Sequence, residues 1–209
     1  MKRPSRSKKK SATTTRTSRT RGRSSRATAW SRKKTSDSRE RTTLAYLGLG
    51  SNLGDRRAYL ESALSEIARL APIKKVSSFY RTEPVGFRDQ PDFWNAVVEV
   101  EWTGSARRLL AAAREVERRV GRTPSFANGP REIDVDVLDF GGRVRDTRDP
   151  VLPHPRLNGR RFALAPLAEI NPDWTDPRTG RSVVELLAAL PKSPRARRVG
   201  KQKTKNGKG

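Results

Sequence analysis

The sequence predicts an α+β fold in which an antiparallel sheet carries its two main helices on one face. Two observations point to this class. Four short stretches between residues 44 and 140 read as strands, and two longer stretches repeat apolar residues at helical spacing. Their order along the chain is strand, helix, strand, strand, helix, strand, with further short helices after it.

Charge divides the 209 residues into three segments. The formal net charge is +24, of which residues 1–41 carry +14 and residues 192–209 carry +8, so residues 42–191 carry only +2. The flanking segments hold too little apolar surface to offset the entropy cost of ordering, and we expect two disordered basic tails. They are either solubilising tails or nonspecific contacts for nucleic acid. We expect residues 42–191 to be the folded domain.

Composition excludes several classes of protein. No apolar run is long enough to cross a bilayer, and the first residues hold no apolar segment of the kind found in secretory signals. Cysteine is absent, which excludes disulfides and thiol catalysis. We therefore expect a soluble, cytoplasmic monomer with no membrane contact.

The folded part begins with a strand over residues 44–50 that runs into a Gly-rich turn at 51–55. No Gly-Lys-Ser/Thr follows the turn, so we interpret it as a tight strand-to-helix connection and not as a phosphate loop. A helix follows, with apolar residues from Leu60 to Leu70 at helical spacing until Pro72 ends it.

The second and third strands are expected at residues 76–81 and 93–102, joined by a connection of eleven residues, 82–92. Hairpin loops usually take about two to five residues, so this connection is a candidate binding loop. Phe93 and Asn95 lie on one face of the third strand. An aromatic ring beside a carboxamide suits a flat heterocycle that stacks and hydrogen-bonds along one edge, whereas the alternative for Asn95 is a surface amide near a strand end.

A second helix is expected from about residue 105 to 120, with Gly121 as its C-terminal stop. Glu117 lies beside the apolar stripe of this helix, and a carboxylate there needs a partner. Arg122 is near in sequence, so a salt bridge at the edge of the core is one interpretation.

The last predicted strand carries two carboxylates on one face. Val135 and Val137 alternate with Asp134 and Asp136, so the acids share a face at a spacing of about 7 Å. Two like charges at that spacing repel each other, which favours either one or two bound Mg²⁺ ions or a solvated acidic face. Bound Mg²⁺ usually connects such carboxylates to the phosphates of a substrate. Arg131 lies just before the two acids and is placed to bind the same phosphates.

The C-terminal part contains the only histidine, His154, and two arginines, Arg160 and Arg161, that begin a short helix through 162–167. A last helix is expected over residues 182–190. His154 is either structural or a phosphate contact.

The order of elements is the ferredoxin-like arrangement, β-α-β-β-α-β, in which both helices cover one sheet face. The apolar faces of the third and fourth strands then lie under the helices. Phe93, Asn95, Asp134 and Asp136 therefore share the opposite face, which is the first indication that they form one site.

Five ordered blocks between residues 43 and 190 resemble one family: Gly50-Ser51-Asn52-Leu53-Gly54, Ser77-Ser78-Phe79-Tyr80-Arg81-Thr82, Asp89-Gln90-Pro91-Asp92-Phe93-Trp94-Asn95-Ala96, Gly129-Pro130-Arg131 through Asp134-Val135-Asp136, and Leu152-Pro153-His154-Pro155. The chain is similar to the 6-hydroxymethyl-7,8-dihydropterin pyrophosphokinases of folate biosynthesis. The resemblance implies transfer of the β,γ-diphosphate of ATP to the pterin hydroxymethyl group, with release of AMP.

The resemblance also implies roles for single residues. Two Mg²⁺ ions would be held by Asp134 and Asp136. The pterin would be bound by Phe93 and Phe162, which stack on it, and along its edges by Thr82, Pro84, Val85 and Asn95. ATP would be bound by Glu117, Arg131, Val137, His154 and Arg160. The charge in transfer would be stabilised by Arg122 and Arg131.

One departure from the family pattern concerns the loop at residues 123–128, which holds no basic residue. Family members commonly carry further positive charge there, so lid closure and turnover are in question, and Arg160 or Arg161 is an alternative source of charge. Two other functions remain open: a nucleic-acid-binding module with basic arms, which predicts aromatic and basic residues on the open sheet face, and a non-catalytic family member. Glu99 and Glu101 at outward positions count against the first.

Overall fold

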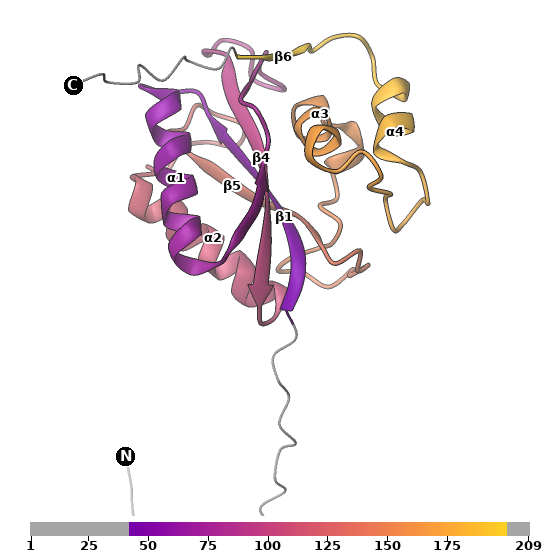
Figure 1. Cartoon of the computed structure of the whole chain (residues 1–209). Helices are drawn as coiled ribbons and strands as arrows, with labels where there is room; N and C mark the ends of the chain where they lie inside the picture. Colours follow the sequence, from indigo (N-terminus) through magenta and orange to yellow (C-terminus); the bar gives the residue numbers. More distant parts are fainter. Residues whose placement is uncertain (1–41, 200–209) are drawn as a thin grey trace, which may run out of the picture. The chain divides into compact units, whose positions relative to one another are not determined.

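The computed structural model describes residues 42–199 and confirms the predicted α+β, ferredoxin-like class (Figure 1). Its elements are β1 (Thr42–Ser51), α1 (Arg56–Leu70), β2 (Ile73–Val76), β3 (Tyr80–Thr82), β4 (Phe93–Thr103), α2 (Ala106–Val120), β5 (Asp134–Phe140), a 3-10 turn (Leu157–Gly159), α3 (Arg161–Ile170), α4 (Val183–Ala189) and β6 (Ala196–Arg198).

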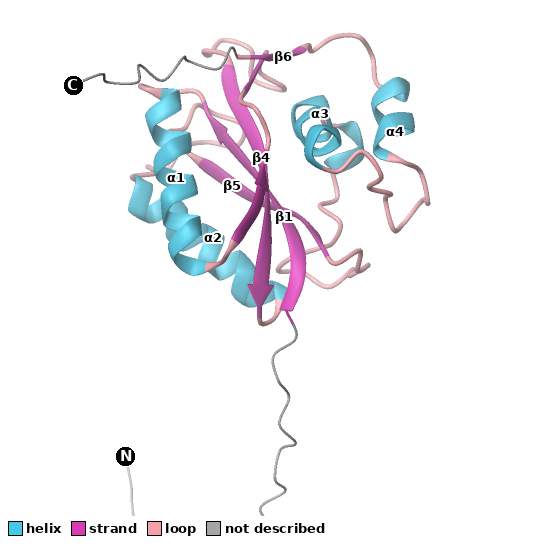
Figure 2. Ribbon diagram, viewed as in Figure 1, coloured by secondary structure: helices cyan, strands magenta, loops and turns pink. Residues whose placement is uncertain are grey.

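The sheet is antiparallel, with the strand order β5-β1-β4-β3-β6, and β2 pairs with β4 beside β3. Helices α1 and α2 lie together on one face of this sheet (Figure 2). Their buried residues, among them Leu60, Ile67, Leu109 and Val116, pack on the alternate apolar positions of β1, β4 and β5. Burial of this apolar surface is the main term that holds the two layers together.

Local sequence signals set the helix ends. Asp55 caps α1 by accepting a hydrogen bond from the backbone amide of Ala58, and Ser105 caps α2 by accepting one from Arg108. Gly121 ends α2 in the left-handed conformation with φ 101°, where a side chain would be strained. These are the turns that the sequence predicts.

The predicted second strand is wrong in detail, because two short strands replace it. β2 ends at Val76, β3 begins at Tyr80, and Ser77 lies between them. The hydroxyl of Ser77 accepts a hydrogen bond from the backbone amide of Val97 at 2.9 Å, while the Ser77 amide donates to the Val97 carbonyl. A side-chain acceptor thus replaces a backbone one, which interrupts the strand.

Helices α3 and α4 pack on the other face of the sheet, which the sequence leaves open (Figure 1). Glu99 is therefore not the outward, solvated acid that we expected: it is only 5% exposed. Its carboxylate accepts a 2.7 Å hydrogen bond from the hydroxyl of Tyr46, which in turn accepts one of 2.8 Å from Asn171. Burial, reinforced by the bond to Glu99, raises the pKa of Tyr46, so the hydroxyl stays a donor.

The described part of the chain continues past the expected C-terminal boundary at residue 191. Residues 192–199 belong to the described part, and Ala196–Arg198 forms β6 against β3. The predicted tail over residues 1–41 and the rest of the C-terminal tail, residues 200–209, lie outside the described residues. Among the described helices, none is both long and apolar enough to cross a membrane.

We predict that Tyr46→Phe destabilises the chain. The change removes the hydroxyl donor of a buried carboxylate, which costs about 1–3 kcal/mol. The midpoint of urea unfolding should fall with an unchanged slope. Tyr59→Phe on α1, outside this network, is the control, and an equal effect of the two changes would contradict the role given to Tyr46.

Candidate active site

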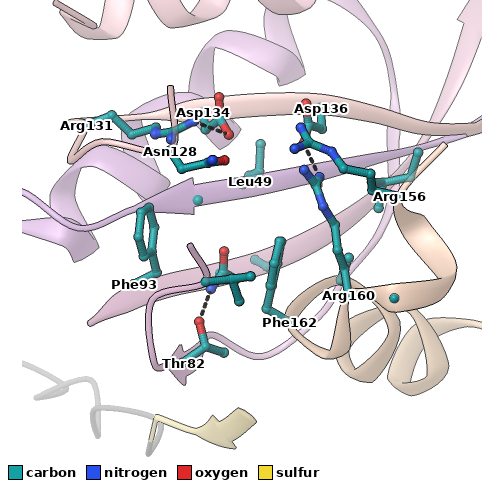
Figure 3. Close-up of a pocket in the computed structure, with 18 of the residues that line it drawn as sticks. Leu49, Thr82, Phe93, Asn128, Arg131, Asp134, Asp136, Arg156, Arg160 and Phe162 are labelled. Carbon is teal, nitrogen blue, oxygen red and sulfur yellow. Dashed lines mark hydrogen bonds and ion pairs between the residues drawn. The ribbon is translucent and has the colours of Figure 1, made fainter. Parts of the chain in front are cut away.

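A pocket of about 670 Å³ opens on the sheet face opposite α1 and α2. Its floor is formed by β1, β4 and β5, and its sides by β3 and by residues 155–163, which lead into α3. Figure 3 shows the carboxylates of Asp134 and Asp136 along one side and the rings of Phe93 and Phe162 facing each other across the pocket. Phe93, Asn95, Asp134 and Asp136, which we expect to share one sheet face, all line this pocket.

Arginines pair with both carboxylates of β5. Asp134 accepts hydrogen bonds from Arg122 at 2.7 Å and from Arg131 at 3.0 Å. Asp136 accepts one from Arg160 at 2.8 Å. The aspartate side chains are 28% and 36% exposed, so they are neither buried nor a freely solvated acidic face. Positive charge offsets the repulsion that the sequence predicts for this strand.

The same arginines lie against the aromatic rings. The guanidinium of Arg131 is 5.9 Å from the ring centroid of Phe93, and that of Arg160 is 5.3 Å from the ring centroid of Phe162. Each ring thus has a cation at its edge of the pocket, in the range where cation–π attraction acts. The pocket has a charged side and an apolar side that share two arginines.

A buried amide lines the pocket together with the two rings. Asn95 is 5% exposed, so it is not a surface amide, and its side chain donates a 2.7 Å hydrogen bond to the hydroxyl of Thr82. Gly50, opposite Asn95 in the β1–β4 register, would place a Cβ 3.0 Å from the Asn95 oxygen. Glycine at this position keeps the amide oxygen accessible at the pocket floor.

Four of the predicted binding residues do not line the pocket with their side chains. Pro84 lies between two lining residues, and Val137 is 3% exposed in the core on the opposite sheet face. Glu117 accepts from the amide of Val135 at 2.8 Å and also pairs with Arg122, as its salt-bridge interpretation requires. Burial raises the pKa of Glu117.

His154, the fourth of these residues, lies next to Asp136, with 3.9 Å between its Nε2 and the carboxylate. Its other ring nitrogen, Nδ1, accepts a hydrogen bond from the amide of Arg156. Burial lowers the pKa of His154, so the neutral ring is favoured near neutral pH. Its position is that of a support for Asp136.

Sequence reasoning missed Arg156 and Asn128, which both line the pocket. Arg156 directly follows the Pro-His-Pro segment, and a basic residue beside that family block was the available signal. Arg161, which we offered as a source of charge, instead donates to the carbonyls of Leu187 and Leu190 at the end of α4. It does not line the pocket.

Asn52, directly after β1, connects the pocket to both long loops. Its amide donates to Gln90 at 2.9 Å and to the carbonyl of Pro91 at 3.1 Å, and its oxygen accepts from the amide of Arg131 at 2.8 Å. Gln90 also donates to the carbonyl of Asn128 at 2.9 Å. Asn52 is 2% exposed and acts as a positioning residue, in keeping with the tight turn predicted there.

The donor set for a metal ion consists of the two carboxylates of β5. Within residues 42–199, no group of three or more histidine, cysteine, aspartate or glutamate side chains is placed to hold a metal ion. Mg²⁺ keeps several waters and is usually bound through one or two carboxylates together with phosphate oxygens. Asp134 and Asp136 fit a magnesium ion that arrives with a phosphate ligand.

Comparisons with known proteins give the family of the chain. Residues 46–172 match the model of the 7,8-dihydro-6-hydroxymethylpterin-pyrophosphokinase family. A 2-amino-4-hydroxy-6-hydroxymethyldihydropteridine pyrophosphokinase of Bacillus subtilis is 43% identical over 129 residues, which are 61% of this chain and 77% of the relative. Folic acid synthesis protein fol1 of Schizosaccharomyces pombe is 36% identical over 153 residues, 72% of this chain but only 21% of that much longer protein.

Among solved structures, Plasmodium falciparum HPPK-DHPS wild type with STZ-DHP superposes with a TM-score of 0.57 at 15% identity, over 71% of this chain and 43% of that one, which supports the fold alone. The family match and the Bacillus relative define the class: the chain is an enzyme of the pyrophosphokinase type. It belongs to the 7,8-dihydro-6-hydroxymethylpterin-pyrophosphokinase family.

We predict that Asn52→Ala loosens both pocket loops. The change leaves the part-buried amide of Arg131 without its acceptor, at a cost of about 1–3 kcal/mol. Hydrogen exchange at the Arg131 amide should accelerate, and the free energy of unfolding should fall. Gln90→Ala removes the side-chain bonds of Gln90 to Asn52 and to the carbonyl of Asn128 but keeps the Asn52 oxygen as the acceptor of the Arg131 amide, which should stay protected. Equal exchange in the two variants would contradict the assignment.

Proposed function

We propose that the chain transfers the β,γ-diphosphate of ATP to the hydroxymethyl group of 6-hydroxymethyl-7,8-dihydropterin, releasing AMP, in folate biosynthesis. One observation carries the proposal. A single pocket combines two paired carboxylates with several arginines on one side and two aromatic rings with a buried amide on the other. That combination suits a polyphosphate and a flat heterocycle held next to each other.

The charged side is proposed to bind the ATP phosphates. Four arginines line the described pocket: Arg122, Arg131, Arg156 and Arg160. Their guanidinium groups present forked donors that match phosphate oxygens. Phosphoryl-type transfer depends mostly on positioning and on charge stabilisation, so we assign Arg122 and Arg131, which both reach Asp134, to the transferring diphosphate. Glu117 and His154 then act by holding Arg122 and Asp136.

The apolar side is proposed to bind the pterin. Phe93 and Phe162 provide two ring faces, and Asn95 provides a carboxamide held by Thr82. A carboxamide both donates and accepts, so it can pair with a ring edge that presents a donor next to an acceptor. Backbone groups around Pro84 and Val85 are proposed to complete the edge contacts.

Magnesium is proposed as the metal, with two ions bound by Asp134 and Asp136. When bound, it would neutralise phosphate charge and orient the triphosphate. The chain's own contribution is to hold both carboxylates on one strand face beside the arginines. The carboxylate oxygens are therefore already partly dehydrated before a ligand binds.

The two alternatives are weaker. A nucleic-acid-binding sheet would offer aromatic and basic residues on an open face, whereas α3 and α4 cover much of this face and Glu99 is buried under them. The assay below decides whether the chain is a non-catalytic family member, since such a protein would form no AMP. Nonspecific nucleic-acid contact through the basic tails remains a proposal based on charge alone.

We predict that the protein with ATP, Mg²⁺ and the hydroxymethylpterin forms AMP and not ADP. Asp134→Ala and Asp136→Ala should each lower the rate at least a hundredfold, because each removes half of the carboxylate donor set and unpairs its arginines. Asp146→Ala, which removes a 76% exposed carboxylate outside the pocket, is the matched control.

Formation of ADP would contradict diphosphate transfer, and an aspartate variant within tenfold of wild type would contradict the metal assignment. Because Asp134 is paired with two arginines, its removal is also expected to lower the unfolding temperature slightly.

The loop at residues 123–128 yields a kinetic prediction. Phe126 in this loop packs edge-on against Phe87 of the 82–92 connection at 5.3 Å between ring centroids, while Ala127 is exposed. Ala127→Arg should bring positive charge over the phosphates and raise kcat by up to about tenfold, the scale of one charge-assisted contact. The KM for pterin should change little; Ala127→Gln is the control for size.

Single-turnover kinetics measures the chemical step directly. If Ala127→Arg leaves that step unchanged while Arg156→Ala slows it sharply, the missing charge comes from the segment before α3, and the explanation by the loop is wrong.

A further inference from the structure

The last described strand borders the apolar side of the pocket. β6 pairs antiparallel with β3, so that Ala196 lies opposite Thr82 and Arg198 lies opposite Tyr80. β3 has only three residues, and β6 gives it a second neighbour besides β4. The family match ends at residue 172, so β6 lies beyond the part of the chain that defines the family.

One side chain of β6 connects three elements. The Nε of Arg198 donates a 3.0 Å hydrogen bond to the hydroxyl of Tyr80, and its Nη2 lies 3.4 Å from the carboxylate of Glu169 on α3. That carboxylate also accepts from the Tyr80 hydroxyl at 2.9 Å, from the Ser78 amide at 3.1 Å and from the Ser78 hydroxyl at 2.8 Å. Glu169 is thus bonded to Ser78 within the break and to Tyr80 at the start of β3.

These bonds among Arg198, Tyr80, Glu169 and Ser78, called the junction below, connect the elements that form two walls of the pocket. On α3, Phe162 and Glu169 are seven residues apart, two helical turns, so they lie on the same helix face. Phe162 lines one wall, and Thr82, two residues after Tyr80, lines the other. The separation of these walls therefore depends on how closely Glu169 holds α3 to β3.

We propose that β6, through Arg198 and Glu169, positions α3 against β3 and so sets the width of the pterin half of the pocket. The proposal rests on the proposed function, in which the pterin lies between Phe93 and Phe162. The junction involves neither Asp134 nor Asp136, so its effect falls on the heterocycle and not on the phosphates. A heterocycle stacked on two faces loses contact when the gap widens, because dispersion attraction declines within a fraction of an ångström.

The test is equilibrium binding to the full chain in the presence of α,β-methylene ATP, whose α–β bridge cannot be cleaved. Arg198→Ala should raise the Kd for the pterin roughly three- to tenfold, the scale of one ordinary hydrogen bond, and leave the Kd for the ATP analogue within about twofold. Arg197→Ala is the matched control, since Arg197 is the exposed neighbour on the same strand with the same charge.

A second variant separates positioning from general loosening. Glu169→Gln should raise the Kd for the pterin and leave the Kd for the ATP analogue unchanged. The double variant with Arg198→Ala should bind the pterin as tightly as the more weakly binding of the two single variants, because both changes break the same junction. Unchanged pterin affinity in Arg198→Ala, or an equal loss of affinity for both ligands, would overturn the proposal. If the wild-type chain itself bound no pterin, the proposed function would fail and this inference with it.

Discussion

Two like charges on one face of a strand are the constraint on which this site depends. Asp134 and Asp136 alternate with buried valines on β5, so the fold cannot turn them away from each other without exposing its core. Three arginines reach these two carboxylates, two from the connection between α2 and β5 and one from the start of α3. These ion pairs help to hold the connection before β5 and the start of α3 in place.

The apolar core and one buried amide do the remaining positioning. Packing of α1 and α2 fixes β1 and β5 as neighbours, while Asn52 at the end of β1 hydrogen-bonds to both long loops. Each loop is irregular and mostly exposed, so it contributes little burial of its own. The hydrogen bonds of a single asparagine therefore matter more here than they would in a regular hairpin.

Sequence periodicity predicted the parts of the fold that have strong alternation or helical spacing, and it placed Phe93, Asn95, Asp134 and Asp136 on one face. It failed where a side chain replaces a backbone partner, as Ser77 does between β2 and β3. It also failed where contacts are distant in sequence: Glu99 is buried only because α3 covers it, and β6 is a strand only because β3 offers an edge. A basic, three-residue strand carries no periodic signal.

The shared arginines link the two halves of the pocket physically. Under the proposed function, a cation alone would displace Arg131 and Arg160 from their carboxylates and leave them uncompensated beside new positive charge. A phosphate group alone would be repelled by the carboxylates of Asp134 and Asp136. A cation bound together with a polyphosphate gives both the carboxylates and the arginines a partner of opposite charge. The carboxylates then bind the metal in place of arginine, and the arginines bind phosphate in place of carboxylate. Because the same guanidinium groups lie over Phe93 and Phe162, that exchange also changes the surroundings of the rings between which the heterocycle would stack.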